Sequence, residues 1–287
     1  MGSALLESAG MIVEKKTLLK EHAMEFCSSV SLFAMLFSTP LWFFARADLV
    51  PLGAVGWIFL ASIAYALTML FFAKALRHMA ISYTTPFLAF GPLVTAILAF
   101  LFLGERLNMV QWLGVAVILL GAYLLYSHSH KDLLEPFKKA HKLPHMKYVW
   151  LGILFYAITG ILDKKIVGAS ELAVPVISYL TIMFFFIGVI FIVMMLLFHD
   201  GFHGIGNGMR NNTKWLSSVA ILTIGFKIMV MYAIATPGVL LSLVIPIKKL
   251  SALFSTIIGG ELFHEDHLLR KTAAALIMII GAAILVL

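Results

Sequence analysis

The sequence predicts an all-α polytopic membrane protein with about ten transmembrane helices, arranged as two inverted five-helix repeats. Three observations support this prediction: the composition, a succession of long apolar runs, and landmarks that occur once in each half. Hydrophobic residues make up 62% of the 287 positions and charged residues only 12%. A soluble domain is about half apolar and about a quarter charged. This composition excludes a water-soluble enzyme, a disordered chain and a disulfide-rich secreted domain.

The apolar runs are continuous and long, which indicates helices, because lipid offers no partners to backbone polar groups. Strands of a membrane barrel would instead be short and would alternate between apolar and polar residues. The first run is too short to span, since about a dozen residues before Glu14 cover about 20 Å of a hydrocarbon core about 30 Å thick. We therefore expect a short or incomplete first helix. The predicted helices cover residues 3–13, 24–45, 53–76, 82–103, 110–127, 148–166, 174–198, 215–234, 240–259 and 272–287.

Two polar stretches interrupt these runs. Residues 128–147 join the two halves as a charged linker, and residues 199–214, rich in Gly, Asn and His, are predicted to form a second loop. The chain thus divides into a first repeat, 1–127, the linker, and a second repeat, 148–287.

The two halves share landmarks in the same order. An acid followed by two lysines closes the first run of each half, at Glu14 and Asp163, and a Gly-Glu pair closes the fourth, at Glu105 and Glu261. Each half holds five helices, and five is odd, so the halves must enter the bilayer in opposite orientations. Such inverted repeats are typical of secondary transporters. A capping or interfacial role is the simplest interpretation of the two Gly-Glu pairs.

The ends of both halves resemble EamA domains of the drug/metabolite transporter superfamily. The resemblance rests on the stretch Pro86–Pro92, on Leu-Gly-Glu-Arg-Leu at 103–107 followed by spaced glycines, and in the second half on Pro246, Gly-Gly-Glu at 259–261 and Gly281. It implies ten helices in two inverted bundles, a substrate cavity between them, and transport of small organic metabolites such as amino acids or sugar-related compounds. It supplies no catalytic residues, and the chain departs from it in the short first helix and the charged ninth.

Lysines inside the apolar runs are the candidate binding residues. A charge at mid-bilayer costs about 2.5–3.5 kcal/mol on insertion scales, so such a residue faces a bundle interior or a wet cavity. Lys248 and Lys249 lie in the middle of the ninth run, Lys227 in the eighth, and Lys74 near the end of the third. Lys74 is also placed well to extend its stem to the interface. Asp163 is a candidate solute or proton site, although acid-Lys-Lys triplets are also typical interfacial anchors.

Three prolines within the runs, Pro86, Pro92 and Pro246, are candidate kinks or gates because proline removes a helical hydrogen bond. Pro246 stands two residues before Lys248, so a kink there would free backbone carbonyls that could hold the ammonium group of Lys248.

We therefore expect a secondary transporter of a small organic solute, and the buried lysines favour a solute with an anionic group. The alternatives are an intramembrane enzyme acting on lipids and a structural membrane subunit. The formal charge of +7 comes from loop lysines and arginines, which favours a bilayer and not nucleic acid as the partner. We expect no cofactor or metal, and a place in a bacterial or archaeal plasma membrane. Loop charges put 128–147 in the cytoplasm and both termini outside, whereas the resemblance implies cytoplasmic termini; both orientations stay open.

Overall fold

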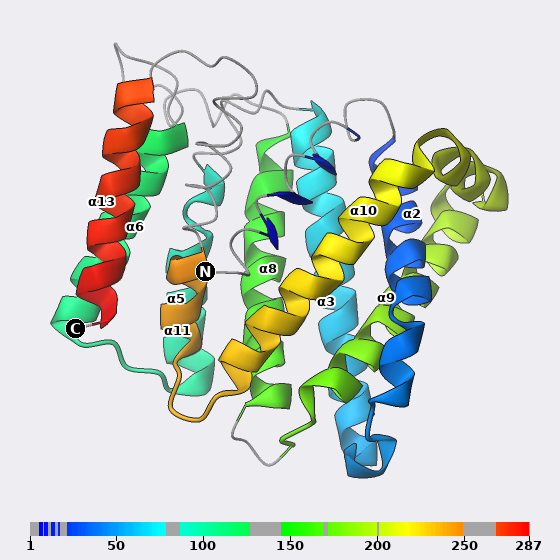
Figure 1. Ribbon diagram of the computed structural model, residues 1–287, viewed down its shortest axis with the longest axis horizontal. Helices are drawn as coiled ribbons and strands as arrows, with labels where there is room; N and C mark the ends of the chain where they lie inside the picture. Colours follow the sequence, from blue (N-terminus) through cyan, green and yellow to red (C-terminus); the bar gives the residue numbers. More distant parts are fainter. Residues whose placement is uncertain are drawn as a thin grey trace.

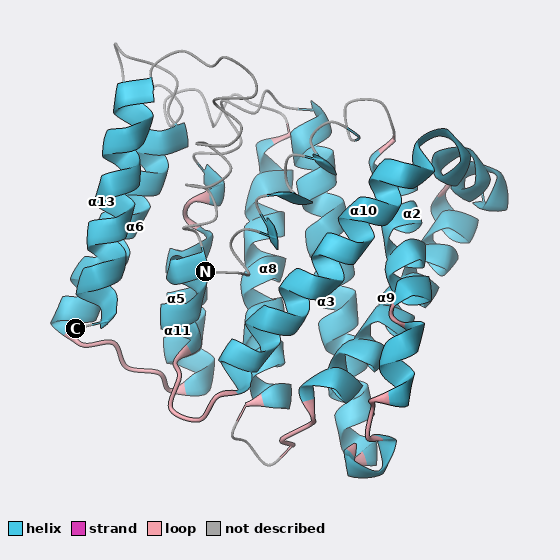
Figure 2. Ribbon diagram, viewed as in Figure 1, coloured by secondary structure: helices cyan, strands magenta, loops and turns pink. Residues whose placement is uncertain are grey.

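The computed structural model describes residues 6–7, 9–10, 13–14, 17, 22–78, 87–126, 145–168, 172–199, 201–248 and 268–286. Within these ranges the regular structure is entirely helical (Figures 1 and 2). The α-helices are α2 (Ala23–Phe37), α3 (Leu52–His78), α5 (Gly91–Leu103), α6 (Met109–Tyr126), α8 (Met146–Val167), α9 (Val176–Phe198), α10 (Gly201–Ala235), α11 (Leu241–Lys248) and α13 (Leu268–Val286), with two short 3₁₀ turns at Thr39–Phe43 and Ala47–Leu49. Each of these α-helices overlaps one of the predicted apolar runs, although α10 begins well before its run.

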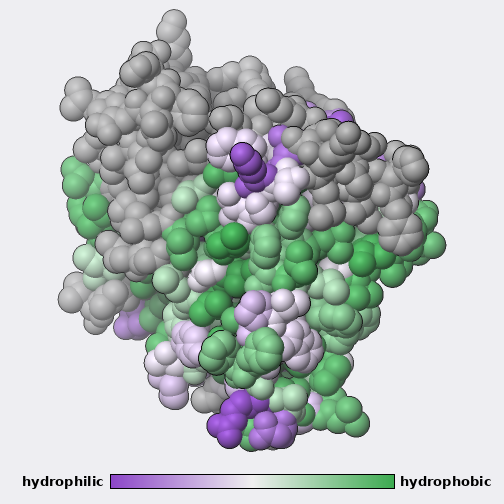
Figure 3. All heavy atoms as spheres, turned by 45° about the vertical axis from the view of Figure 1, so that its right-hand side comes forward, coloured by the Kyte–Doolittle hydropathy of each residue, from purple (hydrophilic) through white to green (hydrophobic). Residues whose placement is uncertain are grey.

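Five helical segments in the described part of the chain are long and apolar enough to cross a bilayer. They are Ala23–Phe43, Leu52–His78, Met146–Val167, Val176–Phe198 and Asn212–Ala235. Large apolar side chains cover the outside of the bundle, among them Phe102 (72% exposed) and Phe198 (73% exposed). Figure 3 shows one such face, on which the described residues are mostly hydrophobic, with strongly hydrophilic residues at the lower tip and near the upper end. An apolar exterior of this kind is stable only in lipid, so the prediction of an all-helical membrane protein is confirmed.

The main core is formed by α2, α3, α8, α9 and α10, and it combines large apolar side chains with small residues. Helix α3 buries a series of alanines together with Ser62 and Thr68, so α8 and α9 can approach it closely. Gly152 of α8 admits the ring of Phe72, and Gly188 of α9 admits Met35, whose Sδ would lie 2.6 Å from an added Cβ. Close helix contact of this kind is the usual way in which membrane bundles gain packing energy.

A second, smaller core joins α6 and α13, which run in opposite directions at one side of the bundle (Figure 1). A Cβ added to Gly121 would lie 2.6 Å from Cγ of Met278, and one added to Gly281 would lie 2.7 Å from the backbone N of Ile118. These two glycines therefore set the distance between the helices.

The structure differs from two of the predicted boundaries. Helix α5 begins at Gly91, after helical residues at 87–88 and a turn at 89–90, so Pro92 lies in the first turn of α5 and not in its interior. Proline is well tolerated there because that N–H has no acceptor within the helix. The predicted loop 199–214 is largely helical, since α10 starts at Gly201 and passes through a kink at Asn212 (φ −137°, ψ 28°). The linker 128–144 and the second half of the ninth run lie outside the described residues.

Candidate functional site

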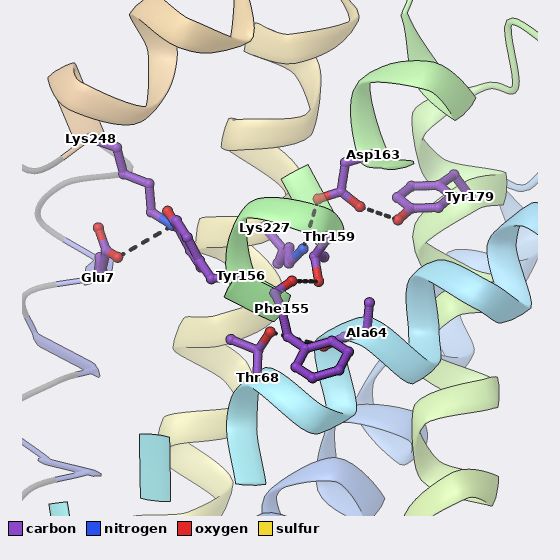
Figure 4. A network of polar contacts seen from close by, with 10 residues as sticks. All are labelled: Glu7, Ala64, Thr68, Phe155, Tyr156, Thr159, Asp163, Tyr179, Lys227 and Lys248. Atoms are coloured by element: carbon purple, nitrogen blue, oxygen red, sulfur yellow. Dashed lines mark hydrogen bonds and ion pairs between the residues drawn. The ribbon is translucent and has the colours of Figure 1, made fainter. Parts of the chain in front are cut away.

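Lys248, at the end of α11, is held by groups from three other parts of the chain. Its Nζ lies 3.4 Å from Oε1 of Glu7 and donates to the hydroxyl of Tyr156 at 3.2 Å. The same ammonium group lies 4.3 Å from the ring centre of Phe226 and 5.1 Å from that of Tyr156, a cation–π arrangement. We refer to Glu7, Tyr156, Phe226 and Lys248 as the Lys248 site; Figure 4 shows Glu7, Tyr156 and Lys248 together.

A second ion pair lies in the same polar network, between α8 and α10. Nζ of Lys227 lies 3.2 Å from Oδ2 of Asp163, and the hydroxyl of Tyr179 on α9 donates to the other carboxylate oxygen, Oδ1 (Figure 4). The Lys227 ammonium group also faces the ring of Tyr65 on α3, 4.4 Å from its centre. We call Asp163, Tyr179 and Lys227 the Asp163 triad. Its charged side chains are no more than 7% exposed, and each charge has its partner.

Helix periodicity explains why these groups meet. Tyr156 and Asp163 stand seven residues apart on α8, about two turns, and so lie on one face. Phe226 and Lys227 are adjacent on α10, which lets one face the Lys248 site and the other the Asp163 triad. Helix α11 packs on α5, α8 and α10, which brings Lys248 over the end of this face.

The chemistry of the network suits the recognition of charge rather than metal binding. Two ammonium groups and two carboxylates lie close together, and Lys227 and Lys248 are near enough to act on each other electrostatically. Aromatic rings and hydroxyls supply the remaining contacts. Within the described residues no group of three or more His, Cys, Asp and Glu side chains could hold a metal ion.

The structure brings together three of the predicted site residues: Asp163, Lys227 and Lys248. Lys74 is not among them, because it lies near the end of α3 with its ammonium group 5.7 Å from the ring centre of Tyr148. This position fits the interpretation that its stem extends toward the interface. Lys249 and Pro86 lie outside the described residues.

Pro246 lies inside α11, as predicted, and the use of its freed carbonyls to hold Lys248 stays a prediction. Among the described residues, a carboxylate and a phenol hold the ammonium group of Lys248. It is instead Lys164 that binds carbonyls, donating to those of Ile234 and Val239 at 2.7 Å each. Lys164 thereby fixes the turn between α10 and α11.

Glu105 anchors the opposite end of α11, and its capping role is confirmed. Glu105 is buried, and its carboxylate accepts from the backbone N–H of Leu241 at 2.7 Å, from that of Ser242 at 2.9 Å and from the Ser242 hydroxyl at 2.5 Å. A negative charge at a helix N-terminus also complements the helix dipole. The first predicted repeat thus positions the short helix of the second repeat that carries Lys248.

Sequence reasoning missed the aromatic members of the network. Tyr65, Tyr156, Tyr179 and Phe226 are ordinary residues of apolar helices, and nothing in their local pattern distinguishes them. A weak signal existed for Tyr156, which stands two turns from Asp163 on a helix whose polar side chains are few.

A hollow of about 400 Å³ lies beside Glu105, away from the Lys248 site. It is lined by Ala96, Phe100, Glu105, Arg106, Leu107 and Trp112. The Phe100 ring is 54% exposed and that of Trp112 is 36% exposed, so this hollow borders the apolar exterior of α5 and α6.

The sequence is similar to a known transporter family and to several bacterial membrane proteins. Residues 1–127 match the EamA-like transporter family. The chain is 33% identical over 72 residues to the probable 4-amino-4-deoxy-L-arabinose-phosphoundecaprenol flippase subunit ArnE of Yersinia pestis, and 30% identical over 70 residues to that of Pectobacterium atrosepticum. These matches cover 25% and 24% of this chain, and the chain spans 63% and 62% of those relatives.

The fold also matches that of a solved crystal structure, with a TM-score of 0.72 at 12% identity, over 98% of this chain and 93% of the other. At that identity the similarity concerns the fold alone. The apolar exterior, the spanning helices and the match of residues 1–127 lead to one assignment. This chain is a multi-pass integral membrane protein whose residues 1–127 match the EamA-like transporter family, and the relatives compared above are bacterial.

Proposed function

We propose that this EamA-family transporter moves a small organic solute that carries a carboxylate or phosphate, and that Lys248 binds the anionic group. The observation that carries this proposal is the setting of Lys248. The Lys248 side chain is 11% exposed, and the described partners of its ammonium group are one carboxylate oxygen, one phenol and two ring faces. An incoming anion needs to replace only a single ionic contact.

Transport by alternating access between two inverted five-helix halves fits this setting. Glu7 and Tyr65 belong to the first predicted half, and Tyr156, Lys227 and Lys248 to the second, so the network lies where the halves would separate. The antiparallel course of α6 and α13, the last helices of the two halves, supports an inverted relationship (Figure 1).

Pro246 is the best candidate for a hinge at this site. It lacks an N–H, so the carbonyl of Ser242, four residues earlier, receives no helical hydrogen bond from it. The N-terminal end of α11 is fixed by Glu105, whereas its C-terminal end carries Lys248. Bending at Pro246 would move the ammonium group while the capped end stays in place.

A second candidate solute is an amphiphile with a phosphate, moved as part of a larger assembly. Two observations favour it: the ArnE relatives carry the name of a subunit that flips a sugar-phosphate lipid, and the hollow beside Arg106 borders the lipid-facing exterior. The alternatives of an intramembrane enzyme or a purely structural subunit have less support, because the family is one of transporters.

Uptake into proteoliposomes tests the proposal. The panel comprises D-glucuronate, L-alanine, glucose 6-phosphate and glucose, each labelled, with wild type, Lys248→Met and Lys165→Met compared at equal protein density. Lys165 is the control lysine, since its ammonium group lies 3.9 Å from the ring centre of Trp57, outside the Lys248 site. We expect uptake of at least one solute with an anionic group, lost at least tenfold in Lys248→Met and kept in Lys165→Met. Equal uptake by all three proteins would refute the role of Lys248.

A further inference from the structure

The two ion pairs of the network differ in how completely their carboxylates are satisfied. Both oxygens of Asp163 have partners, one in Tyr179 and one in Lys227. Among the residues that the structure describes, Glu7 binds Lys248 through Oε1, while its other oxygen, Oε2, is buried and finds no hydrogen-bond partner there. A buried carboxylate oxygen without a donor costs free energy, so Glu7 is held less firmly than Asp163.

Other features of Glu7 point the same way. Its pair is longer than that of Asp163, 3.4 Å against 3.2 Å, and more exposed, with 15% of the Glu7 side chain accessible against 4% for Asp163. Glu7 is therefore the exchangeable member of the network, and Asp163 the fixed one.

The group that Glu7 presents to Lys248 is chemically the same as the anionic group of the proposed solute. An empty transporter that closed around an unpaired ammonium group would bear the full desolvation cost of that charge. With Glu7 on Lys248, the closed empty state is charge-paired. Two carboxylates, Glu7 and Asp163, then balance the two lysines.

We propose that Glu7 is a built-in substitute for the anionic group of the solute, which allows the empty transporter to close and return. This inference rests on the proposed function and adds to it the mode of transport. The protein then works as a uniporter: solute displaces Glu7 on one side of the membrane, and Glu7 reoccupies Lys248 after release on the other. Without the Glu7 carboxylate, only the loaded protein could reorient, and transport would require exchange.

The first test needs no knowledge of the solute. Glu7→Ala removes the carboxylate and leaves space beside Lys248, so added sodium acetate should fill it, with sodium chloride at equal concentration as the salt control. We expect acetate at tens of millimolar to raise the melting temperature of Glu7→Ala by several degrees, with no comparable shift from acetamide. Wild type and the double variant Glu7→Ala/Lys248→Met should not respond. An equal response to acetate in the double variant, or no response in Glu7→Ala, would overturn the assignment of Glu7 to an anion subsite.

The second test measures the mode of transport with the panel solute that wild-type vesicles accumulate. Glu7→Gln keeps the side-chain size and removes the charge, and Glu14→Gln is the matched control on the same segment. For Glu7→Gln we expect uptake into solute-free vesicles to fall at least tenfold, and uptake into vesicles preloaded with the same solute to stay within twofold of wild type. Glu14→Gln should keep both activities.

The outcomes separate the two claims. Normal uptake of Glu7→Gln into solute-free vesicles overturns the uniport inference and leaves the role of Lys248 intact. A panel that wild type does not transport overturns the proposed function and the uniport inference with it, while the acetate experiment still decides whether Glu7 occupies an anion subsite.

Discussion

The carboxylate of Asp163 and the ammonium group of Lys227 form a buried ion pair, with 3.2 Å between Oδ2 and Nζ and no more than 7% of either side chain exposed. Asp163 also accepts from Tyr179, so the pair joins α8, α9 and α10. Its complete satisfaction indicates a structural role, whereas the Lys248 site is open to exchange.

Breaking the Asp163 pair should destabilise the protein more than removing it altogether. Lys227→Met leaves a buried carboxylate with one partner, and the loss of one member of a buried pair costs about 3–5 kcal/mol. The double variant Asp163→Asn/Lys227→Met leaves no unpaired charge and should recover part of that loss. Melting temperatures of the purified proteins in detergent measure both. If the loss of stability in the double variant equals the sum of the losses in Lys227→Met and Asp163→Asn, the two side chains act independently.

Loss of the Glu105 cap on α11 should lower the melting temperature of the protein. Glu105→Ala leaves two backbone N–H groups and the Ser242 hydroxyl without their acceptor, and loss of a cap costs about 0.5–2 kcal/mol. Glu105→Gln retains one acceptor oxygen and should fall between Glu105→Ala and wild type. Melting temperature is again the readout.

The exposed cap at Asn108, whose Oδ1 accepts from the N–H of Gln111 at 2.7 Å, gives the comparison. We expect Asn108→Ala to cost less than Glu105→Ala, and the reverse order would contradict the buried cap.

The close approach of α6 and α13 at Gly281 predicts that a larger side chain there destabilises the protein. A Cβ on Gly281 would meet backbone atoms, the N of Ile118 at 2.7 Å and the O of Gly114 at 3.0 Å, which cannot move aside as a side chain could. Gly281→Ala should therefore cost about 1–3 kcal/mol. A Cβ added to Gly56 on α3 would meet none of the described neighbouring atoms within 4 Å, so Gly56→Ala should be neutral or stabilising, by up to about 1 kcal/mol. Equal melting temperatures of the two variants would contradict the close approach of α6 and α13.

The topology predicts labelling from opposite sides of the membrane. Asp48 lies in the turn between α2 and α3, and Lys214 lies near the start of the spanning segment Asn212–Ala235. The start of α10 and the connection between α2 and α3 lie at opposite ends of the bundle (Figure 1). The native Cys27 is fully buried and provides a quiet background. A membrane-impermeant thiol reagent added to sealed vesicles should label either Asp48→Cys or Lys214→Cys, but not both. Labelling of both from the same side would contradict the spans, and the side that reacts decides between the two orientations inferred from loop charge and from family resemblance.

Composition and apolar runs predicted the fold class, because a bilayer imposes length and helicity on every span. They also identified Lys248 as a candidate, because a lysine at the centre of an apolar run must face a bundle interior or a wet cavity. They could not supply Glu7 as its partner, because a contact between the first helix and the ninth depends on tertiary packing. Pro92 shows a different limit. The apolar run is continuous before and after this proline, so the sequence does not reveal whether it starts a new helix or lies inside a longer one. The 199–214 stretch was misjudged because glycine and asparagine usually mark loops, yet α10 continues through them with a kink at Asn212.

The central claim, that the Lys248 ammonium group binds the anionic group of the solute, is tested most directly by comparing an acid with its neutral amide. The affinity of the wild type for the transported acid and for the corresponding carboxamide is measured by binding to purified protein, and repeated with Lys248→Met. A hydrogen bond to a charged group contributes about 1.5–3 kcal/mol, so wild type should prefer the acid by about tenfold or more. Lys248→Met should bind the two compounds within about twofold of each other. A preference for the acid that survives unchanged in Lys248→Met would contradict the claim.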